Sequence, residues 1–390
     1  MYPHQIDRLT ATLEREGLQA FIATSAENVF YMTGFRSLNH AIFRAQQFAV
    51  WTKQGTALVV PAVDVPHLMS EGVEVGHVGA FGGFVCSYAE GLGPDERKIR
   101  ERTEPRAASP GHALATALEA VGVRDGRVGL DESNLTPAAW ERLGARLAGY
   151  TVVPAAAALL TARRVKSPYE IECLGRALGI AEEALNAVLQ MLEPGVTERA
   201  AATVYQAAVL ERDASCTPSS ISFGERTWIS LAPPTARALK PGELARFDVG
   251  AIFKGYWASV ARTAVMGEPS PRQLAAAEAV QAGLEAGIDA VKPGATAGHV
   301  YDAVMTATRT AGLPDFQRGH VGHAIGLEPY ERPKLDAGNG TVLEAGEVLR
   351  IEVPHLEVGW AGVALRDTVL VTTTGSRVLN RSARGLVVLD

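Results

Sequence analysis

The sequence lacks several features on which whole classes of protein depend. Its 390 residues include only three cysteines, Cys86, Cys173 and Cys216, and no CxxC pair. So few scattered cysteines exclude a disulfide-stapled domain and favour free thiols in a reducing compartment. The longest uncharged stretch, 147–162, has sixteen residues and contains Gly149 and Pro154. It is too short and too broken to span a bilayer of about 30 Å.

An excess of positive charge is also missing. Lys and Arg number 37 against 43 Asp and Glu, for a net charge of −6, and the two signs are mixed along the chain. No basic face is therefore expected, and neither nucleic acid nor a membrane is an expected partner. His4, Asp7 and Arg8 stand where a secretory signal needs apolar residues. We therefore expect a cytoplasmic protein.

The chain length and its 47% hydrophobic content predict two or three domains with substantial cores. The first third alternates helix and strand, which is typical of an α/β fold. A helix ends at Gly17, a buried strand covers Ala20–Ala23, and Gln54-Gly55 turns a hairpin. Residues 89–111 are polar and are expected to form a loop with a short helix at most.

A domain boundary is expected near residue 162. The composition changes at Arg163-Arg164-Val165-Lys166, and the next four residues, Ser-Pro-Tyr-Glu, have the form of a helix start. Ser167 can cap the backbone, Pro168 suits the first helical position, and Glu170 completes a capping box. We therefore expect domains at 1–161 and 162–390.

The second domain contains an internal repeat. Residues 182–197 and 281–296 align without gaps at an offset of 99 residues. Both read as a helix that stops at a Pro-Gly-x-Thr turn, and both precede a second helix that carries Val-Tyr. This pattern indicates two similar α/β halves.

Two predicted hairpins each carry an acidic residue. Strands at 244–253 and 256–265, turned by Lys254-Gly255, place Asp248 and Ser259 on one face as diagonal neighbours about 7 Å apart. A second hairpin places Glu352 close to opposite Arg366. Between the two hairpins, His320 and His323 lie three residues apart in a Gly-rich segment.

Several motifs of the chain resemble those of one enzyme superfamily. It comprises methionine aminopeptidase, prolidase, Xaa-Pro aminopeptidase and creatinase, which share the pita-bread fold. The matching segments are VKSPYEIE, the DVG hairpin that ends in ARTAV, GHAIGLEPYERP, LEAGEVLRIEVP and GVALRDTVLVTTTG. The first third resembles the creatinase-type N-terminal domain of the Xaa-Pro branch. The resemblance implies an α/β (α+β) chain with these two domains, a peptidase-type hydrolase, and a homodimer.

In active peptidases of this family, two Asp, one His and two Glu hold two divalent cations that activate a water and polarise the scissile carbonyl. The resemblance assigns three of these ligands to Asp248, His323 and Glu352. The second Asp falls on Ser259 and the second Glu on Arg366, and these are the two positions that bridge the metals. The charge of the ligand set changes from −4 to −1.

This change argues against a two-metal centre. A divalent ion about 4 Å from a guanidinium is repelled by roughly 8 kcal/mol at an effective dielectric of about 20. We expect Arg366 to reach Glu352 and Asp248 in place of the cations. The alternative is a single Mn or Zn held by Asp248, His323 and Glu352, with Arg366 turned away.

Two family histidines are also replaced, because Leu231 and Tyr330 stand at their positions. Only His320 and His323 remain for proton transfer, and the plainest interpretation of both is a hydrogen-bonded pair in a former site.

Three hypotheses follow for the function. The first is a pseudoenzyme without metal that binds a small peptide or amino-acid derivative, with Arg366 and Tyr330 contacting it. The second is a metal-independent small-amide hydrolase in which His320 or His323 is the acid/base and Arg366 stabilises negative charge. The third is a residual one-metal Xaa-Pro peptidase.

Overall fold

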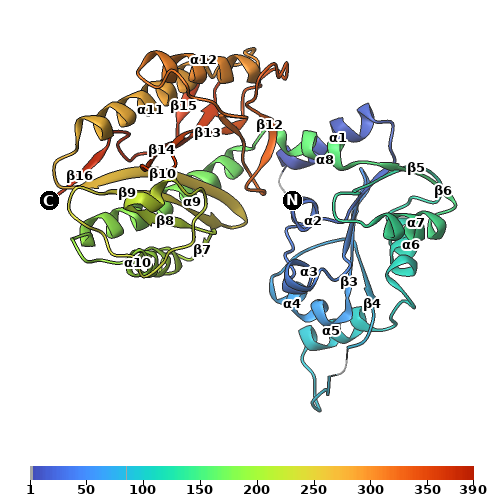
Figure 1. Ribbon diagram of the computed structural model, residues 1–390. Helices are drawn as coiled ribbons and strands as arrows, with labels where there is room; N and C mark the ends of the chain where they lie inside the picture. Colours follow the sequence, from blue (N-terminus) through green and yellow to red (C-terminus); the bar gives the residue numbers. More distant parts are fainter. Residues whose placement is uncertain (1–2, 85) are drawn as a thin grey trace. The chain divides into compact units, whose positions relative to one another are not determined.

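The computed structural model describes residues 3–84 and 86–390. The chain divides into two compact units, Met1–Arg163 and Arg164–Asp390 (Figure 1). Among the described residues, no helix combines the length and the apolar content that crossing a bilayer requires. The mixed α/β class expected from the sequence is confirmed.

The first unit is built on a six-stranded mixed sheet. In spatial order its strands are β4 (His77–Phe81), β3 (Thr56–Pro61), β2 (Phe48–Trp51), β1 (Ala20–Ala23), β5 (Gly126–Leu130) and β6 (Tyr150–Pro154). The helices are α1 (Pro3–Arg15), α2 (Ala26–Thr33), α3 (Leu38–Phe43), α4 (Val65–Ser70), α5 (Pro94–Thr103), α6 (Pro110–Ala120), α7 (Pro137–Arg146) and α8 (Ala156–Arg164). The predicted first strand and the β2–β3 hairpin are confirmed.

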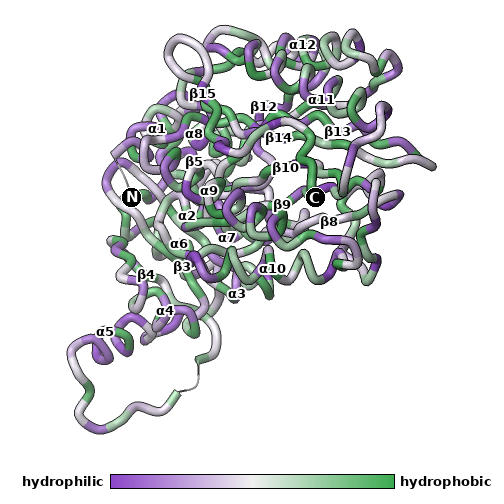
Figure 2. Tube along the Cα trace, turned by 90° about the vertical axis from the view of Figure 1, so that its left-hand side faces the viewer, coloured by the Kyte–Doolittle hydropathy of each residue, from purple (hydrophilic) through white to green (hydrophobic). Residues whose placement is uncertain are grey.

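The segment 89–111 holds more helix than the sequence suggested. It contains the ten-residue helix α5, and α6 begins at Pro110. Helix α5 is almost wholly hydrophilic (Figure 2), and only Thr103 is buried. The apolar periodicity by which a helix is recognised is therefore missing from it.

A buried carboxylate ties β5 to α2. Asp131 is fully buried, and its Oδ2 accepts hydrogen bonds from the backbone and hydroxyl of Ser25 and from Asn28 Nδ2 at 2.7 Å. Its Oδ1 accepts from Ser133. Burial alone would raise the pKa of Asp131, but these hydrogen bonds outweigh it and hold the pKa below its ordinary value.

Replacing Asp131 by Asn should lower the free energy of unfolding of this unit by about 1–3 kcal/mol, because several buried donors lose a charged acceptor. The stabilisation that ionised Asp131 provides is complete above the pKa that this residue has in the unfolded chain. It is lost as pH falls through the lowered pKa of the folded state. The difference in free energy of unfolding between the native chain and Asp131→Asn should therefore shrink on acidification. Urea unfolding across this pH range measures it, with Asp125→Asn, at an exposed position, as the control. A gap that widens in acid would contradict the assignment.

The second unit is built on a ten-stranded sheet. In spatial order its main path is β12 (Glu331–Lys334), β11 (Gly322–Ala324), β13 (Val348–Leu356), β14 (Gly362–Val371), β10 (Tyr256–Met266), β9 (Leu244–Phe253) and β7 (Ser215–Cys216). Three further strands pair with this path: β8 (Ser220–Phe223) with β9, β15 (Ser376–Val378) with β14, and β16 (Val387–Leu389) with β10.

Two helix pairs cover the two halves of this sheet. Helices α9 (Pro168–Met191) and α10 (Glu198–Leu210) form one core with β9 and β10, and α11 (Pro271–Ala290) and α12 (Ala297–Thr310) form another with β13 and β14 (Figure 1). Thr197 and Thr296, which end the repeated turn, cap α10 and α12 with the same backbone angles. The predicted repeat is therefore a structural one.

The helix that opens this unit begins as its sequence predicts. Ser167 Oγ accepts from the backbone of Glu170, and the Glu170 carboxylate accepts in return from the Ser167 backbone N–H. Pro168 occupies the first helical position. These local contacts determine where α9 starts.

Alternation along the strands gives the sheet one apolar and one polar face. Phe247 and Val249 of β9 and Ile351 of β13 belong to the cores beneath the helices. The residues between them along each strand point to the other face of the sheet, and they include Asp248, Arg350 and Glu352. The candidate site lies on this polar face.

Candidate functional site

Four strands place the central residues of the site in one row. Ala261 of β10 pairs with Asp248 of β9 on one side and with Arg366 of β14 on the other, and Arg366 pairs with Glu352 of β13. Neighbouring strands lie about 4.8 Å apart. Because Ala261 has only a methyl side chain, Arg366 can extend over it toward Asp248. The predicted register of both hairpins is confirmed.

The Arg366 guanidinium lies between the two carboxylates. Its Nη2 is 3.0 Å from Asp248 Oδ2 and 2.8 Å from Glu352 Oε2, and its Nε is 3.1 Å from the same Glu352 oxygen. Its Nη1 also donates to Asp248 Oδ1. Burial alone would raise the pKa of Glu352, but Arg366 and Arg350 outweigh it and bring the pKa to about 2. Both acids are thus held by one cation.

A second arginine, Arg350, which sequence reasoning missed, occupies the other half of the site. Its Nη2 is 2.6 Å from His323 Nε2 and 3.4 Å from Glu352 Oε2, while its Nη1 donates to Ser259 Oγ at 3.1 Å. Its spacing in the sequence could have revealed it. Arg350 precedes Glu352 by two residues, so both side chains lie on the same face of β13. Burial lowers the pKa of Arg350 to about 10, so it remains a cation at neutral pH.

His323 has no ring nitrogen left over. Its Nδ1 is 2.7 Å from the carbonyl oxygen of Ala324, which can only accept, so Nδ1 carries the proton and Nε2 accepts from Arg350. Burial, and then the charge of Arg350, lower the pKa of His323 to about 3. The ring of Tyr330 stacks on it with centroids 3.6 Å apart. His323 is therefore a neutral imidazole with both nitrogens engaged.

His320 lies nearby under different constraints. Its Nδ1 is 3.7 Å from Glu352 Oε1, beyond hydrogen-bond distance, and its ring meets the edge of Tyr330. Burial lowers its pKa, while Glu352 opposes that shift.

Leu231 lies in the loop after the short helix η2 (Gly224–Trp228), is 70% exposed and has a positive φ of 54°. All the site residues named from the sequence thus meet in one region.

These side chains surround a cavity of about 280 Å³. Its wall includes Asp248, Glu352, Arg366, Arg350, Arg246, Arg318, His320, Tyr330 and Leu231. This volume is smaller than that of typical drug-sized ligand pockets, so the cavity suits a small molecule.

The residues present do not fit a pair of metal ions. Arg366 occupies the oxygens of Asp248 and Glu352 through which they would coordinate, and Arg350 occupies the Nε2 lone pair of His323. Within the part of the chain that the structure describes, no three His, Cys, Asp or Glu side chains are grouped to hold a metal. Two positively charged guanidinium groups stand where a metal site would need coordinating side chains.

Comparison with known proteins assigns the family. Residues 172–373 match the model of metallopeptidase family M24, and residues 5–165 match that of the creatinase/prolidase N-terminal domain. The chain belongs to metallopeptidase family M24. Its two domains are those of the Xaa-Pro dipeptidase and prolidase group, so the resemblance seen in the sequence and the pita-bread fold are confirmed.

Individual relatives agree with this assignment. The Xaa-Pro dipeptidase of Pyrococcus furiosus is 29% identical over 231 residues, which are 58% of this chain and 65% of that protein. The dipeptidase PepE of Mycobacterium ulcerans has a TM-score of 0.78 at 25% identity and covers 99% of this chain and 97% of its own. The X-Pro aminopeptidase of Thermotoga maritima has a TM-score of 0.81 over 98% and 99% of the two chains. At 19% identity it supports the fold alone.

Replacing Arg366 by Met should lower the free energy of unfolding by about 3–5 kcal/mol, because the buried carboxylate of Glu352 and the half-buried one of Asp248 lose their shared partner. Adding Asp248→Asn and Glu352→Gln to Arg366→Met should recover part of this loss. Urea unfolding measures both effects, and Arg199→Met, at an exposed position of α10, is the control. If Arg366→Met unfolds like the control, the guanidinium does not hold the two acids.

Proposed function

We propose that this M24-family protein binds a small peptide or amino-acid derivative in its cleft and does so without a metal centre and without metal-dependent peptidase activity. The observation that carries the proposal is the position of Arg366 between Asp248 and Glu352. Arg350 supports it by occupying His323 Nε2.

The chemistry follows from what a guanidinium supplies. It gives a fixed positive charge and several N–H donors, as a cation site does, and it can orient a carboxylate. It has no open coordination position, so it cannot bind a water and lower that water's pKa as a metal does. Hydrolysis of a peptide bond needs such a nucleophile or a free general base, and His323 offers neither.

A residual one-metal peptidase is the weaker alternative. It would require Arg366 to release both carboxylates and Arg350 to release His323. Each departure would leave buried charged or polar groups without partners, which costs several kcal/mol. The proposal also retains two expectations from the sequence, a cytoplasmic setting and a homodimer, and light scattering measures the second.

The purified protein, incubated with Mn²⁺ or Zn²⁺ and then desalted, should retain less than one equivalent of metal by elemental analysis. It should also release no proline from Xaa-Pro dipeptides, and a chelator should change nothing. Retention of two equivalents together with chelator-sensitive hydrolysis would contradict the proposal. Hydrolysis that ignores the chelator would favour the metal-independent hydrolase instead.

Restoring the missing carboxylates should restore metal binding. We expect the double variant Ser259→Asp with Arg366→Glu to bind metal weakly, because Arg350 still covers His323. Adding Arg350→Thr to that pair should give two bound Mn²⁺ per chain, measured by calorimetry. Arg350→Thr alone is the matched control and should bind none. A triple variant that folds and stays metal-free would show that these positions are not the lost ligands.

A further inference from the structure

The cavity on the polar face carries more positive than negative charge. Its wall holds four arginines, Arg246, Arg318, Arg350 and Arg366, against the two carboxylates of Asp248 and Glu352. These charges leave a net +2, and protonation of a neighbouring histidine would only add to it. A pocket with this balance attracts an anionic ligand.

Arg246 is the most unusual member of this set. It is 2% exposed, its Nη2 donates to the carbonyl of Ile229 at 2.6 Å, and its Nε has no hydrogen-bond partner. No acidic residue in the described ranges 3–84 and 86–390 forms an ion pair with it. The nearest candidate along its strand, Asp248, is already held by Arg366.

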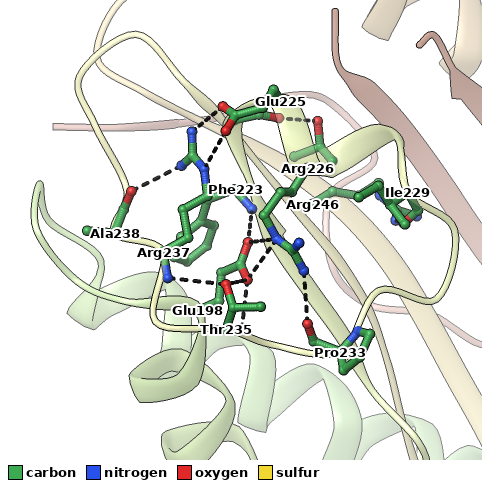
Figure 3. A network of polar contacts seen from close by, with 12 residues as sticks. Glu198, Phe223, Glu225, Arg226, Ile229, Pro233, Thr235, Arg237, Ala238 and Arg246 are labelled. Carbon is green, nitrogen blue, oxygen red and sulfur yellow. Dashed lines mark hydrogen bonds and ion pairs between the residues drawn. The ribbon is translucent and has the colours of Figure 1, made fainter. Parts of the chain in front are cut away.

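Neighbouring arginines are matched to acids in a way that Arg246 is not. In Figure 3, Arg226 meets Glu198, with Nε 3.1 Å from its Oε1, and Arg237 meets Glu225. Arg246 lies beside Ile229 in the same view and donates to its backbone carbonyl. Asp248, two residues along the strand, attracts Arg246 electrostatically but forms its ion pair with Arg366. A buried guanidinium that has no ion pair of its own is costly, and an anion from outside the chain would supply one.

The opposite side of the cavity is also short of negative charge. Glu352 is approached by Arg366, by Arg350 and, at 3.6 Å, by Arg318. Arg318 has 25% of its side chain exposed, and its Nε is without a partner. One carboxylate cannot saturate three guanidinium groups, so donors on Arg318 and Arg350 remain available.

We propose that the cavity is a binding site for a small dicarboxylate of about the size of succinate or glutarate. One ligand carboxylate pairs with Arg246, and the other meets Arg318 and Arg350. The inference rests on the proposed metal-free state of the site, because two cations there would displace these contacts. It narrows the ligand of the proposed function to compounds that carry two acidic groups, such as an acidic amino-acid derivative.

Calorimetry on the full-length protein tests this with succinate and glutarate, beside acetate, the neutral succinamide and inorganic phosphate. We expect one of the dicarboxylates to bind at least about tenfold more tightly than the other three probes, since two charge-assisted contacts add. Arg246→Gln should weaken that binding by at least about tenfold, and Arg318→Gln should also weaken it. Arg199→Gln, at an exposed position of the same unit, should leave it unchanged.

The outcomes separate the two proposals. Metal analysis of the same preparation reports on the metal-free state, and anion binding reports on the ligand class. A metal-free protein that binds no dicarboxylate, or binds phosphate or acetate equally well, overturns the ligand assignment alone. A folded Arg246→Gln variant that binds as the native chain does overturns the role of Arg246. If that variant fails to fold, Arg318→Gln decides in its place.

Discussion

One guanidinium between two carboxylates is the constraint on which the centre of the second unit depends. Asp248 and Glu352 face each other across four strands, with only Ala261 between Asp248 and Arg366 in that row. Glu352 is buried and Asp248 is half-buried, and two carboxylates in such proximity repel each other and need a cation. Arg366 supplies it from the chain itself, so the charge is permanent and cannot be removed by a chelator.

Under the proposed function, a guanidinium of the chain takes the place of mobile metal ions, and this changes what the site can do. A metal centre keeps a coordination position for water or substrate, and a saturated guanidinium does not. Arg350 affects His323 in a similar way, because it donates a hydrogen bond to the Nε2 lone pair that a metal would otherwise use. The helix pairs and the sheet around these residues form the pita-bread fold of the family.

The arginines in the cavity wall also outnumber the acids, and this excess of positive charge favours negatively charged ligands. A site built to hold two divalent ions needs surplus negative charge, whereas this one has surplus positive charge. Arg246 makes the point most clearly, because it is buried, it donates to the backbone carbonyl of Ile229, and it forms no ion pair with any acid in the described part of the chain. This surplus of positive charge is the basis on which we propose that the face binds an anionic ligand.

Local patterns in the sequence predicted several of the elements and the faces of the strands that carry the site. The capping box at Ser167, the turn at Lys254-Gly255 and the opposition of Glu352 and Arg366 depend on residues close together in the chain, and the family resemblance supplied the fold. Helix α5 was not predicted, because it buries almost none of its side chains and so has no apolar periodicity. The contact of Arg350 with His323 and the burial of Arg246 without an ion pair depend on segments that are separated in the sequence and meet only in the folded sheet. Spacing along a strand tells which side chains share a face, but only the assembled sheet decides which acid each arginine meets and which arginine meets none.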